Sequence, residues 1–303
     1  MFLILLIYLK LIHLKSYVKV IDPGFYTTIQ DNGRYGYRKI GIPVSGAMDF
    51  FSYERSNLLV GNIGNEATLE CTLKGPSLLF SSPSWVAVSG AKTDILLNDK
   101  KLKINEPFFC DLGDLLVLGN IYEGQRCYIS FGGGIITEKI FASRSQYFPI
   151  TNKSFINKSD KIPIKSKKRI HKVNLNFTDL KLFDGLIEVL KGPDWEILSN
   201  PTKKKLINFE FKVGSNNRMA YRLSGLNIKN KLSIISSSIL PGTVQLTPNG
   251  DLIIVMRDGQ ITGGYPRILQ LTERSQSKLS QCFLGQKIIF KISEPDKLHQ
   301  KIL

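Results

Sequence analysis

Short apolar runs of strand length, separated by Gly, Pro, Asn and Asp, recur along this chain from Ser16 onward. They contain many β-branched and aromatic residues and lie at 86–88, 95–97, 115–118, 128–131, 186–190, 252–255 and 287–290. Runs of this length and composition are typical of β-strands. Because they do not alternate with helical patterns, they favour packed barrels or sandwiches over a doubly wound sheet. We therefore predict a mainly β protein with a few short helices.

Local signals predict one hairpin and three helices. The segment 94–104 is typical of a β-hairpin that turns at Asn98 and Asp99. Each predicted helix runs from a capping residue to a glycine or polar stop: Asp49 to Gly61, Ser215 or Asn216 to Gly225, and 272 to 281.

The order of the strand-like runs predicts two β-rich lobes, at 17–150 and 173–303. A basic, polar segment at 151–172 is poor in large apolar groups and is expected to be a loop or linker between them. Lys74-Gly75-Pro76 and Lys191-Gly192-Pro193 each follow a strand-like run, a weak echo that suits two related lobes.

Residues 1–16 form an apolar leader. It is shorter than the ~20 residues that span a bilayer, and it has no small-residue cleavage site. Three interpretations stay open: a translation start assigned upstream of the true one, an added edge strand, or a weak membrane-surface anchor. No stable membrane insertion is expected.

Composition narrows the functional classes. The net charge of +16 raises the question of nucleic-acid binding. The basic runs at 165–172 and 203–205 are not interleaved with aromatic residues, so a solvated basic surface is favoured and no nucleic-acid partner is expected. The four cysteines show no paired spacing, which indicates reduced thiols in a cytoplasmic protein.

Several catalytic classes lack the residues that they need. The three histidines, His13, His171 and His299, lie in the leader, the basic segment and the C-terminal tail, so a Ser/His/Asp or Cys/His mechanism is not supported. No Gly-x-x-x-x-Gly-Lys-Ser/Thr stretch is present, so any ATP is expected to bind outside this chain. No metal-ligand cluster is expected either.

Two segments rich in glycine and arginine, at 23–49 and 215–267, are the candidate functional regions. They place amides, hydroxyls and guanidinium groups on tight turns, which suits the binding of small carboxylates, amides or ureas in one shared pocket. The candidate substrate-binding residues are Arg34, Ser45, Asn217, Arg218, Tyr221, Arg222, Gln245, Thr262, Gly263 and Gly264. The candidate catalytic residues are Glu70, Asp49 and Tyr265.

Structural alternatives stay open for these residues. Arg34 and Arg222 are equally suited to ion pairs with Asp31, Asp49 or Glu70. The turn at 262–266 is either an oxyanion-type arrangement of amides or a bulged corner of a barrel strand. The glycine run at 132–134 favours a bulge or a close backbone approach.

Together these segments resemble the biotin-dependent carboxyltransferase family, which includes the C component of 5-oxoprolinase, allophanate hydrolase subunit 2 and an antagonist of a sporulation kinase inhibitor. The matching motifs lie at 24–34, 41–49, 57–62, 69–76, 143–145, 191–193, 215–225, 240–245 and 262–267. The resemblance implies cyclophilin-like barrels. The chain departs from the family at 146–154, a shorter loop without glycine, which implies a reshaped substrate mouth or partner surface.

The resemblance also implies three functions. The first is the C component of a 5-oxoprolinase that uses ATP at the level of a complex with A and B subunits. In that reading Arg34, Arg218 and Arg222 orient the substrate carboxylate. The amides of Gly263 and Gly264 stabilise an oxyanion, and Glu70 or Asp49 transfers protons. The second is carboxyl transfer from a partner's carboxybiotin to a urea-like nitrogen. The third is a non-catalytic regulator that binds a B-type partner.

Overall fold

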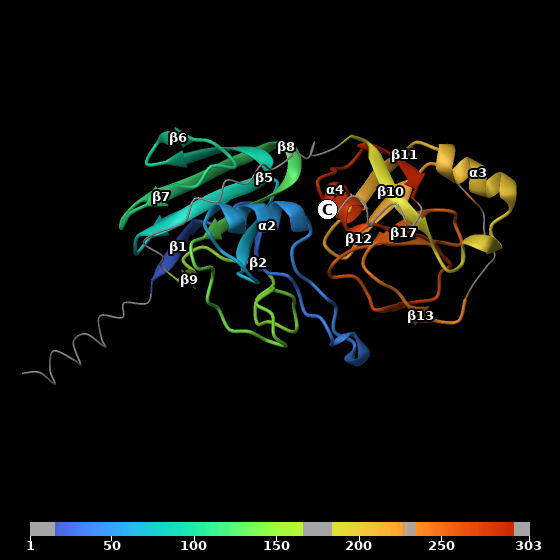
Figure 1. The fold of residues 1–303 in the computed structure, drawn as a ribbon, viewed down its shortest axis with the longest axis horizontal. Coiled ribbons are helices and arrows are strands. Elements are labelled where there is room, and N and C mark those ends of the chain that lie inside the picture. The colour runs from blue at the N-terminus through green and yellow to red at the C-terminus, as the bar shows by residue number, and fades with distance from the viewer. Residues whose placement is uncertain (1–15, 166–183, 227, 229–233, 294–303) are drawn as a thin grey trace, which may run out of the picture. The chain divides into compact units, whose positions relative to one another are not determined.

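The computed structural model describes residues 16–165, 184–226, 228 and 234–293 (Figure 1). Its described residues divide into two compact units. The first contains 16–32, 52–123 and 127–165, and the second contains 33–51, 124–126 and the described residues from 184 onward. Contiguous lobes were predicted, but 33–51 and 124–126 belong to the second unit. Residues 1–15 of the predicted leader and 166–172 of the predicted linker lie outside the described residues.

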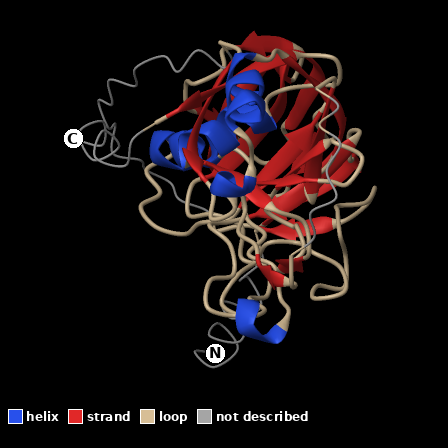
Figure 2. Ribbon diagram, turned by 90° about the vertical axis from the view of Figure 1, so that its right-hand side faces the viewer, coloured by secondary structure: helices blue, strands red, loops and turns tan. Residues whose placement is uncertain are grey.

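Strands outnumber helices in both units (Figure 2), so the predicted mainly β class is confirmed. The first unit holds a nine-stranded sheet with the order β2-β3-β8-β4-β1-β9, and β5 pairs with β6, β7 and β8. Its strands are β1 (Tyr17–Asp22), β2 (Tyr26–Gln30), β3 (Thr68–Thr72), β4 (Ser77–Phe80), β5 (Ser84–Leu97), β6 (Lys100–Leu102), β7 (Phe108–Cys110), β8 (Leu115–Phe131) and β9 (Lys161–Pro163).

Two details of this sheet bear on the predictions. The hairpin β5–β6 turns at Asn98 and Asp99, whose φ angles of 47° and 66° are those of a tight hairpin turn, so that prediction is confirmed. Residues 151–160 form a loop as predicted, but the segment is not a linker, because β9 pairs antiparallel with β1 and Ile162 is buried opposite Val18. Buried apolar residues thus turn 151–165 into part of the first unit.

The second unit is a closed barrel with the order β10-β17-β14-β15-β12-β11-β18. A parallel pairing of β10 with β18 completes the ring. Its strands are β10 (Leu186–Lys191), β11 (Phe211–Asn216), β12 (Ala220–Ser224), β14 (Thr243–Leu246), β15 (Leu252–Val255), β17 (Arg267–Leu271) and β18 (Lys287–Ile292). A separate two-stranded sheet joins β13 (Ser237–Ser238) and β16 (Thr262–Gly263).

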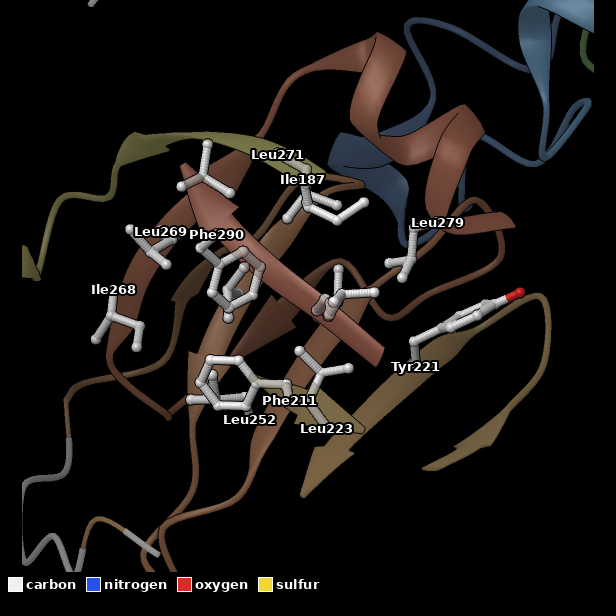
Figure 3. Close-up of a cluster of buried hydrophobic side chains, with 14 of the residues drawn as sticks. Ile187, Phe211, Tyr221, Leu223, Leu252, Ile268, Leu269, Leu271, Leu279 and Phe290 are labelled. Carbon is white, nitrogen blue, oxygen red and sulfur yellow. The ribbon is translucent and has the colours of Figure 1, made fainter. Parts of the chain in front are cut away.

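The barrel core consists of large aliphatic and aromatic side chains from all around the ring (Figure 3). Phe211 and Phe290 pack with their ring centroids 5.2 Å apart. Alternation along β12 buries Tyr221 and Leu223 and exposes Arg222. Burial of such side chains is the main stabilising contribution to a barrel of this kind.

The helices are short. α2 (Phe50–Leu59) begins directly after Asp49, and α4 (Glu273–Ser280) is capped by the Thr272 side chain, so both predicted helices are confirmed. α3 (Asn200–Asn208) was not predicted, although Ser199 caps it. Two 3-10 turns complete the set, η1 (Arg38–Ile40) and η2 (Trp195–Ile197).

The predicted helix from Ser215 or Asn216 to Gly225 is wrong, because this segment forms the hairpin β11–β12. Asn217 makes the turn: its Oδ1 accepts hydrogen bonds from the amides of Met219 (2.8 Å) and Ala220 (3.0 Å). Asparagine readily closes turns in this way, and the side chains that follow alternate with a period of two.

The two Lys-Gly-Pro motifs have the same local role in their own units. The amide of Gly75 donates to Gly119 O (3.1 Å), and the amide of Gly192 donates to Ile268 O (2.9 Å). A Cβ at Gly75 would lie 2.3 Å from the Leu118 Cβ, and one at Gly192 would lie 2.2 Å from Arg267 O. In each case only glycine lets the chain approach the neighbouring strand so closely.

The glycine run, the tryptophans and the cysteines lie where their residue types suggest. A Cβ at Gly133 would lie 2.9 Å from Lys165 O, so the glycine run does mark a close backbone approach. Trp195 is buried, and Trp85 is half-buried against Phe109. All four cysteines are free and buried. Within the described part of the chain, no helix has the length and apolar character needed to cross a membrane.

Candidate functional site

Ser45, a predicted site residue of the second unit, and its neighbour Gly46 have an unusual backbone conformation and are called the tip below. Both have left-handed φ angles, 55° and 86°. This conformation is unfavourable for serine by about 1 kcal/mol and persists only where surrounding contacts enforce it. Two contacts do so here: the Ser45 amide donates to Arg257 O (2.9 Å), and Gly46 O accepts from Arg218 Nη2 (2.7 Å).

The hydroxyl of Ser45 is the unusual feature of this tip. Ser45 is fully buried, and its Oγ has no hydrogen-bond partner among the described residues. A buried hydroxyl without a partner is unfavourable by about 1–3 kcal/mol. A strained backbone that presents an unsatisfied hydroxyl is typical of a ligand-binding position.

Arg218 holds the other side of the tip. Its Nε and Nη2 pair with the two carboxylate oxygens of Asp258 at 2.7 and 3.2 Å, and both side chains are more than nine-tenths buried. The guanidinium that was expected to orient a substrate carboxylate therefore already binds a carboxylate of the protein. The geometry gives Arg218 a positioning role for Gly46.

A buried polar network surrounds the hydroxyl of Tyr221. This hydroxyl donates to Gln125 Oε1 (2.8 Å) and accepts from Arg126 Nη1 (2.8 Å). Arg126 Nη1 also contacts Ser280 O. Figure 3 shows the Tyr221 hydroxyl directed away from the apolar side chains of the barrel core. Tyr221 thus links the core to a polar cluster through its only polar atom.

Gln281 connects Asp49 to this network. Its Oε1 accepts from the amides of Gln125 and Arg126, each at 2.9 Å. Its Nε2 donates to Asp49 Oδ2 (2.7 Å) and to Arg126 O (2.9 Å). Asp49 and Tyr221, both predicted site residues, therefore belong to one hydrogen-bonded cluster in the second unit.

A third group contains Gln245, Gly263 and Tyr265. Gln245 Nε2 donates to Tyr265 O (3.4 Å), and a Cβ at Gly263 would lie 2.6 Å from that Nε2. Gly263 pairs with Ser237 in the small sheet β13–β16, as a strand corner would, and Thr262 is exposed. Gln245 is buried and Tyr265 is 39% exposed.

The remaining predicted site residues of the second unit lie in different local environments. Arg222 is exposed on β12, and Asn217 forms the hairpin turn. Arg34 is fully buried, and its amide donates to Val44 O (2.6 Å). Gly264 accepts a hydrogen bond from the Ile234 amide through its carbonyl (3.1 Å). The expected meeting of the two glycine- and arginine-rich segments is seen for the tip, through Gly46 and Arg218.

The first unit contains Glu70, one of the three predicted catalytic residues. Glu70 lies on β3, is buried, and accepts a hydrogen bond from the Tyr128 hydroxyl (2.8 Å). Nearby in sequence, burial and the charges of Asp31 and Glu66 raise the pKa of Tyr53 well above its ordinary value. Tyr53 therefore stays protonated at neutral pH and donates to Glu66 O (3.1 Å).

Asp31 organises a second cluster in the first unit. Its Oδ1 accepts from the hydroxyls of Ser143 (2.6 Å) and Ser145 (2.7 Å), and its Oδ2 accepts from the Arg144 amide (2.7 Å). These three short hydrogen bonds hold the segment 143–145 against Asp31.

Sequence reasoning missed Arg126, Gln281 and Asp258 as site residues. Nothing local marks them, because each becomes important through a partner far away in the chain. Asp31 and Arg144 do lie in motifs that carry the family resemblance, but neither was among the predicted substrate-binding or catalytic residues. Within the described ranges, no group of three or more His, Cys, Asp or Glu side chains could hold a metal ion.

Comparison with known proteins agrees with the motifs. The family model "Carboxyltransferase domain, subdomain A and B" matches residues 40–292. The chain belongs to this family. This chain is 33% identical to the C subunit of 5-oxoprolinase from Escherichia coli over 279 residues, which cover 90% of each of the two chains. The protein of the same name from Haemophilus influenzae is 29% identical over 94% of each chain.

Urea amidolyase of Lachancea kluyveri is 41% identical, but the match covers 43% of this family member and 7% of that protein. Among solved structures, the Kluyveromyces lactis urea carboxylase has a TM-score of 0.83 at 29% identity, covering 94% of this chain and 28% of the other. The crystal structure of TTHA0988 has the same TM-score at 23% identity and shows the fold alone; this chain matches 55% of its length.

Proposed function

We propose that this chain is the C component of an ATP-dependent 5-oxoprolinase complex with A-type and B-type subunits. One observation carries the proposal: relatives named as the C subunit of 5-oxoprolinase match nearly the whole of both chains, whereas the urea amidolyase match covers less than half of this one. In this reaction water opens the lactam C–N bond of 5-oxoproline to give glutamate, and ATP is hydrolysed. The four free thiols suit a cytoplasmic complex.

The residues of the second unit suit an anionic lactam. Arg126 and Arg218 are buried cationic side chains of this unit, although the Arg218 guanidinium already binds Asp258. The unpartnered Ser45 hydroxyl supplies a hydrogen-bonding group for a polar atom of the substrate. Because the chain has no phosphate-binding loop, we assign ATP to the partner subunits.

We also propose residues that transfer protons in this reaction. Asp49 and Glu70 are buried carboxylates that each accept a hydrogen bond from a neutral donor, Gln281 and Tyr128 respectively. Either is chemically suited to act as a general base, and the half-exposed Tyr265 as a proton donor. The amides of Gly263 and Gly264 are the proposed oxyanion donors.

Reconstitution of the complex tests the assignment. With its A and B partners, the chain should support release of glutamate from 5-oxoproline only in the presence of ATP. Omission of this chain should abolish turnover. Unchanged glutamate release without it would reject the proposal.

Ser45→Ala provides a sharper test inside that assay. Because the Ser45 hydroxyl has no partner among the described residues, its loss should not lower the melting temperature. It should lower kcat/KM for 5-oxoproline about tenfold, which is the effect of losing one hydrogen bond to the substrate. Ser224→Ala, at an exposed position of β12, is the matched control and should change neither quantity.

The structural match to urea carboxylase and the local 41% identity favour one second candidate, carboxyl transfer from a partner's carboxybiotin to a urea-like nitrogen. A carboxybiotin analogue should then bind the chain at millimolar concentration. Absence of binding would reject this alternative without affecting the first.

A further inference from the structure

The segment 141–145 of the first unit has a conformation that its own residues do not favour. Phe141 and Ala142 have left-handed φ angles of 52° and 61°. Neither residue adopts this region readily, so surrounding contacts must enforce it. One contact is the tight pairing of Ile140 with Ser143, whose backbone groups exchange hydrogen bonds of 2.9 and 3.3 Å.

Asp31 supplies the other restraint and places Arg144. It accepts from the Arg144 amide and from the hydroxyls of Ser143 and Ser145, at 2.6–2.7 Å. The Ser145 amide in turn donates to Ser143 Oγ (3.0 Å). These contacts fix the backbone of Arg144 and do not involve its side chain.

The guanidinium of Arg144 has no partner in the part of the chain that the structure describes. The side chain is half-buried, its Nε is fully buried, and it forms no hydrogen bond or ion pair with the described residues. Two buried arginines of the second unit bind carboxylates: Arg218 pairs with Asp258, and Arg257 pairs with Glu273. A buried N–H donor that lacks an acceptor is rare in folded proteins and calls for an explanation.

We propose that Arg144 is a carboxylate-binding residue whose guanidinium forks onto the carboxylate of the small-molecule substrate. A planar guanidinium matches the two oxygens of a carboxylate, and its affinity for that group is highest where water is excluded. The identity of the substrate as 5-oxoproline rests on the proposed function, but the carboxylate site does not.

Side-chain NMR of the full-length chain tests the site directly. The Nε–H resonance of Arg144 is identified by its loss in Arg144→Lys. Sodium acetate and 5-oxoproline should each shift this resonance, whereas 2-pyrrolidinone, the same lactam without a carboxylate, should not. No shift with either carboxylate would overturn the proposal. A shift that occurs only on addition of the partner subunits would also overturn it, because the carboxylate would then belong to a protein.

Kinetics of the reconstituted complex give a second readout. Arg144→Gln should raise the KM for 5-oxoproline about 10- to 100-fold with little change in kcat, the effect of losing one charged pair. Its melting temperature should not fall, because the guanidinium has no partner among the described residues. Lys139→Gln removes one charge from an exposed position of the same loop and should leave KM unchanged.

The outcomes separate the two proposals. An unchanged KM in Arg144→Gln would reject the site while leaving the 5-oxoprolinase assignment intact. A wild-type complex that does not turn over 5-oxoproline, but whose Arg144 resonance still shifts with acetate, would reject the assignment and retain the site.

Discussion

Arg218 shows how a single residue can be predicted correctly as important and incorrectly in its role. Its place in a glycine-rich, arginine-bearing motif marked it as a ligand-binding residue. The structure shows a nearly buried bidentate pair with Asp258, which lies forty residues further along the chain. A pairing at that separation has no local sequence signal, so only the importance of Arg218 could be predicted.

Breaking this pair should be costly. Asp258→Asn leaves the Arg218 charge buried without a carboxylate, and we expect the free energy of unfolding to fall by about 3–5 kcal/mol. Glu210→Gln is the control, because Glu210 and its partner Lys287 are 48% and 59% exposed, so less than about 1 kcal/mol is expected. Thermal and denaturant unfolding measure both. Equal losses in the two variants would show that burial of the pair is unimportant.

Tyr221 allows a test that separates packing from hydrogen bonding. Tyr221→Phe keeps the ring in the barrel core but removes the hydroxyl that bridges Gln125 and Arg126. We expect a loss of about 1–2 kcal/mol in the free energy of unfolding. Tyr122→Phe, at a site that is 67% exposed, should change stability very little. No loss in Tyr221→Phe would mean that the network does not contribute.

At the scale of elements, strands were easier to predict than the turns between them. Apolar alternation and turn residues located the hairpin at Asn98 and Asp99, and a capping threonine located α4. The same reasoning failed at 215–217, where Ser215 or Asn216 was predicted to cap a helix but Asn217 closes a hairpin turn. Strand β9 was missed because it is short and pairs with β1, more than 140 residues away in sequence.

The Lys-Gly-Pro motifs lead to a prediction about elements. In Gly75→Ala the new Cβ would lie 2.3 Å from the Leu118 Cβ, so the adjoining strands must shift. We expect a loss of about 1–3 kcal/mol in the free energy of unfolding, and a similar loss for Gly192→Ala in the barrel. Gly119→Ala, whose nearest neighbour is 3.6 Å away, should be nearly neutral. A neutral Gly75→Ala would contradict the close approach.

At the scale of the whole molecule, the sequence predicted two β-rich lobes, and a closed barrel is present in the second unit. What it did not predict is that residues 33–51 and 124–126 belong to that unit. Membership of this kind depends on contacts such as the one between Asp49 and Gln281, which are non-local and have no periodic signal.

Acid should destabilise the protein through its paired carboxylates. The pKa of Asp22 is lowered by its hydrogen bond from Lys74. For Asp194, burial acts in the opposite direction, but hydrogen bonds from Arg267 outweigh it and lower the pKa. Such groups stabilise the fold above the unfolded pKa of about 4, and this contribution is lost as the pH falls through the lower folded-state pKa.

Asp194→Asn isolates one of these contributions. The variant should melt at a lower temperature than the wild type at pH 7, and the difference should shrink as the pH falls below about 4. Melting temperatures measured between about pH 7 and pH 2 test this. A difference that stays constant over this range would show that ionisation of Asp194 has no part in stability.

The second unit is built from three separate segments of the chain, so it cannot be expressed whole as one continuous fragment. A fragment that begins after residue 183 would contain every barrel strand, yet it would lack the amides and side chains of Gln125 and Arg126 that satisfy Gln281 and Tyr221. We therefore expect the barrel to be no autonomous folding module. When the chain is expressed as two halves split after residue 183, the second half should not fold unless the first half is present to supply Gln125 and Arg126.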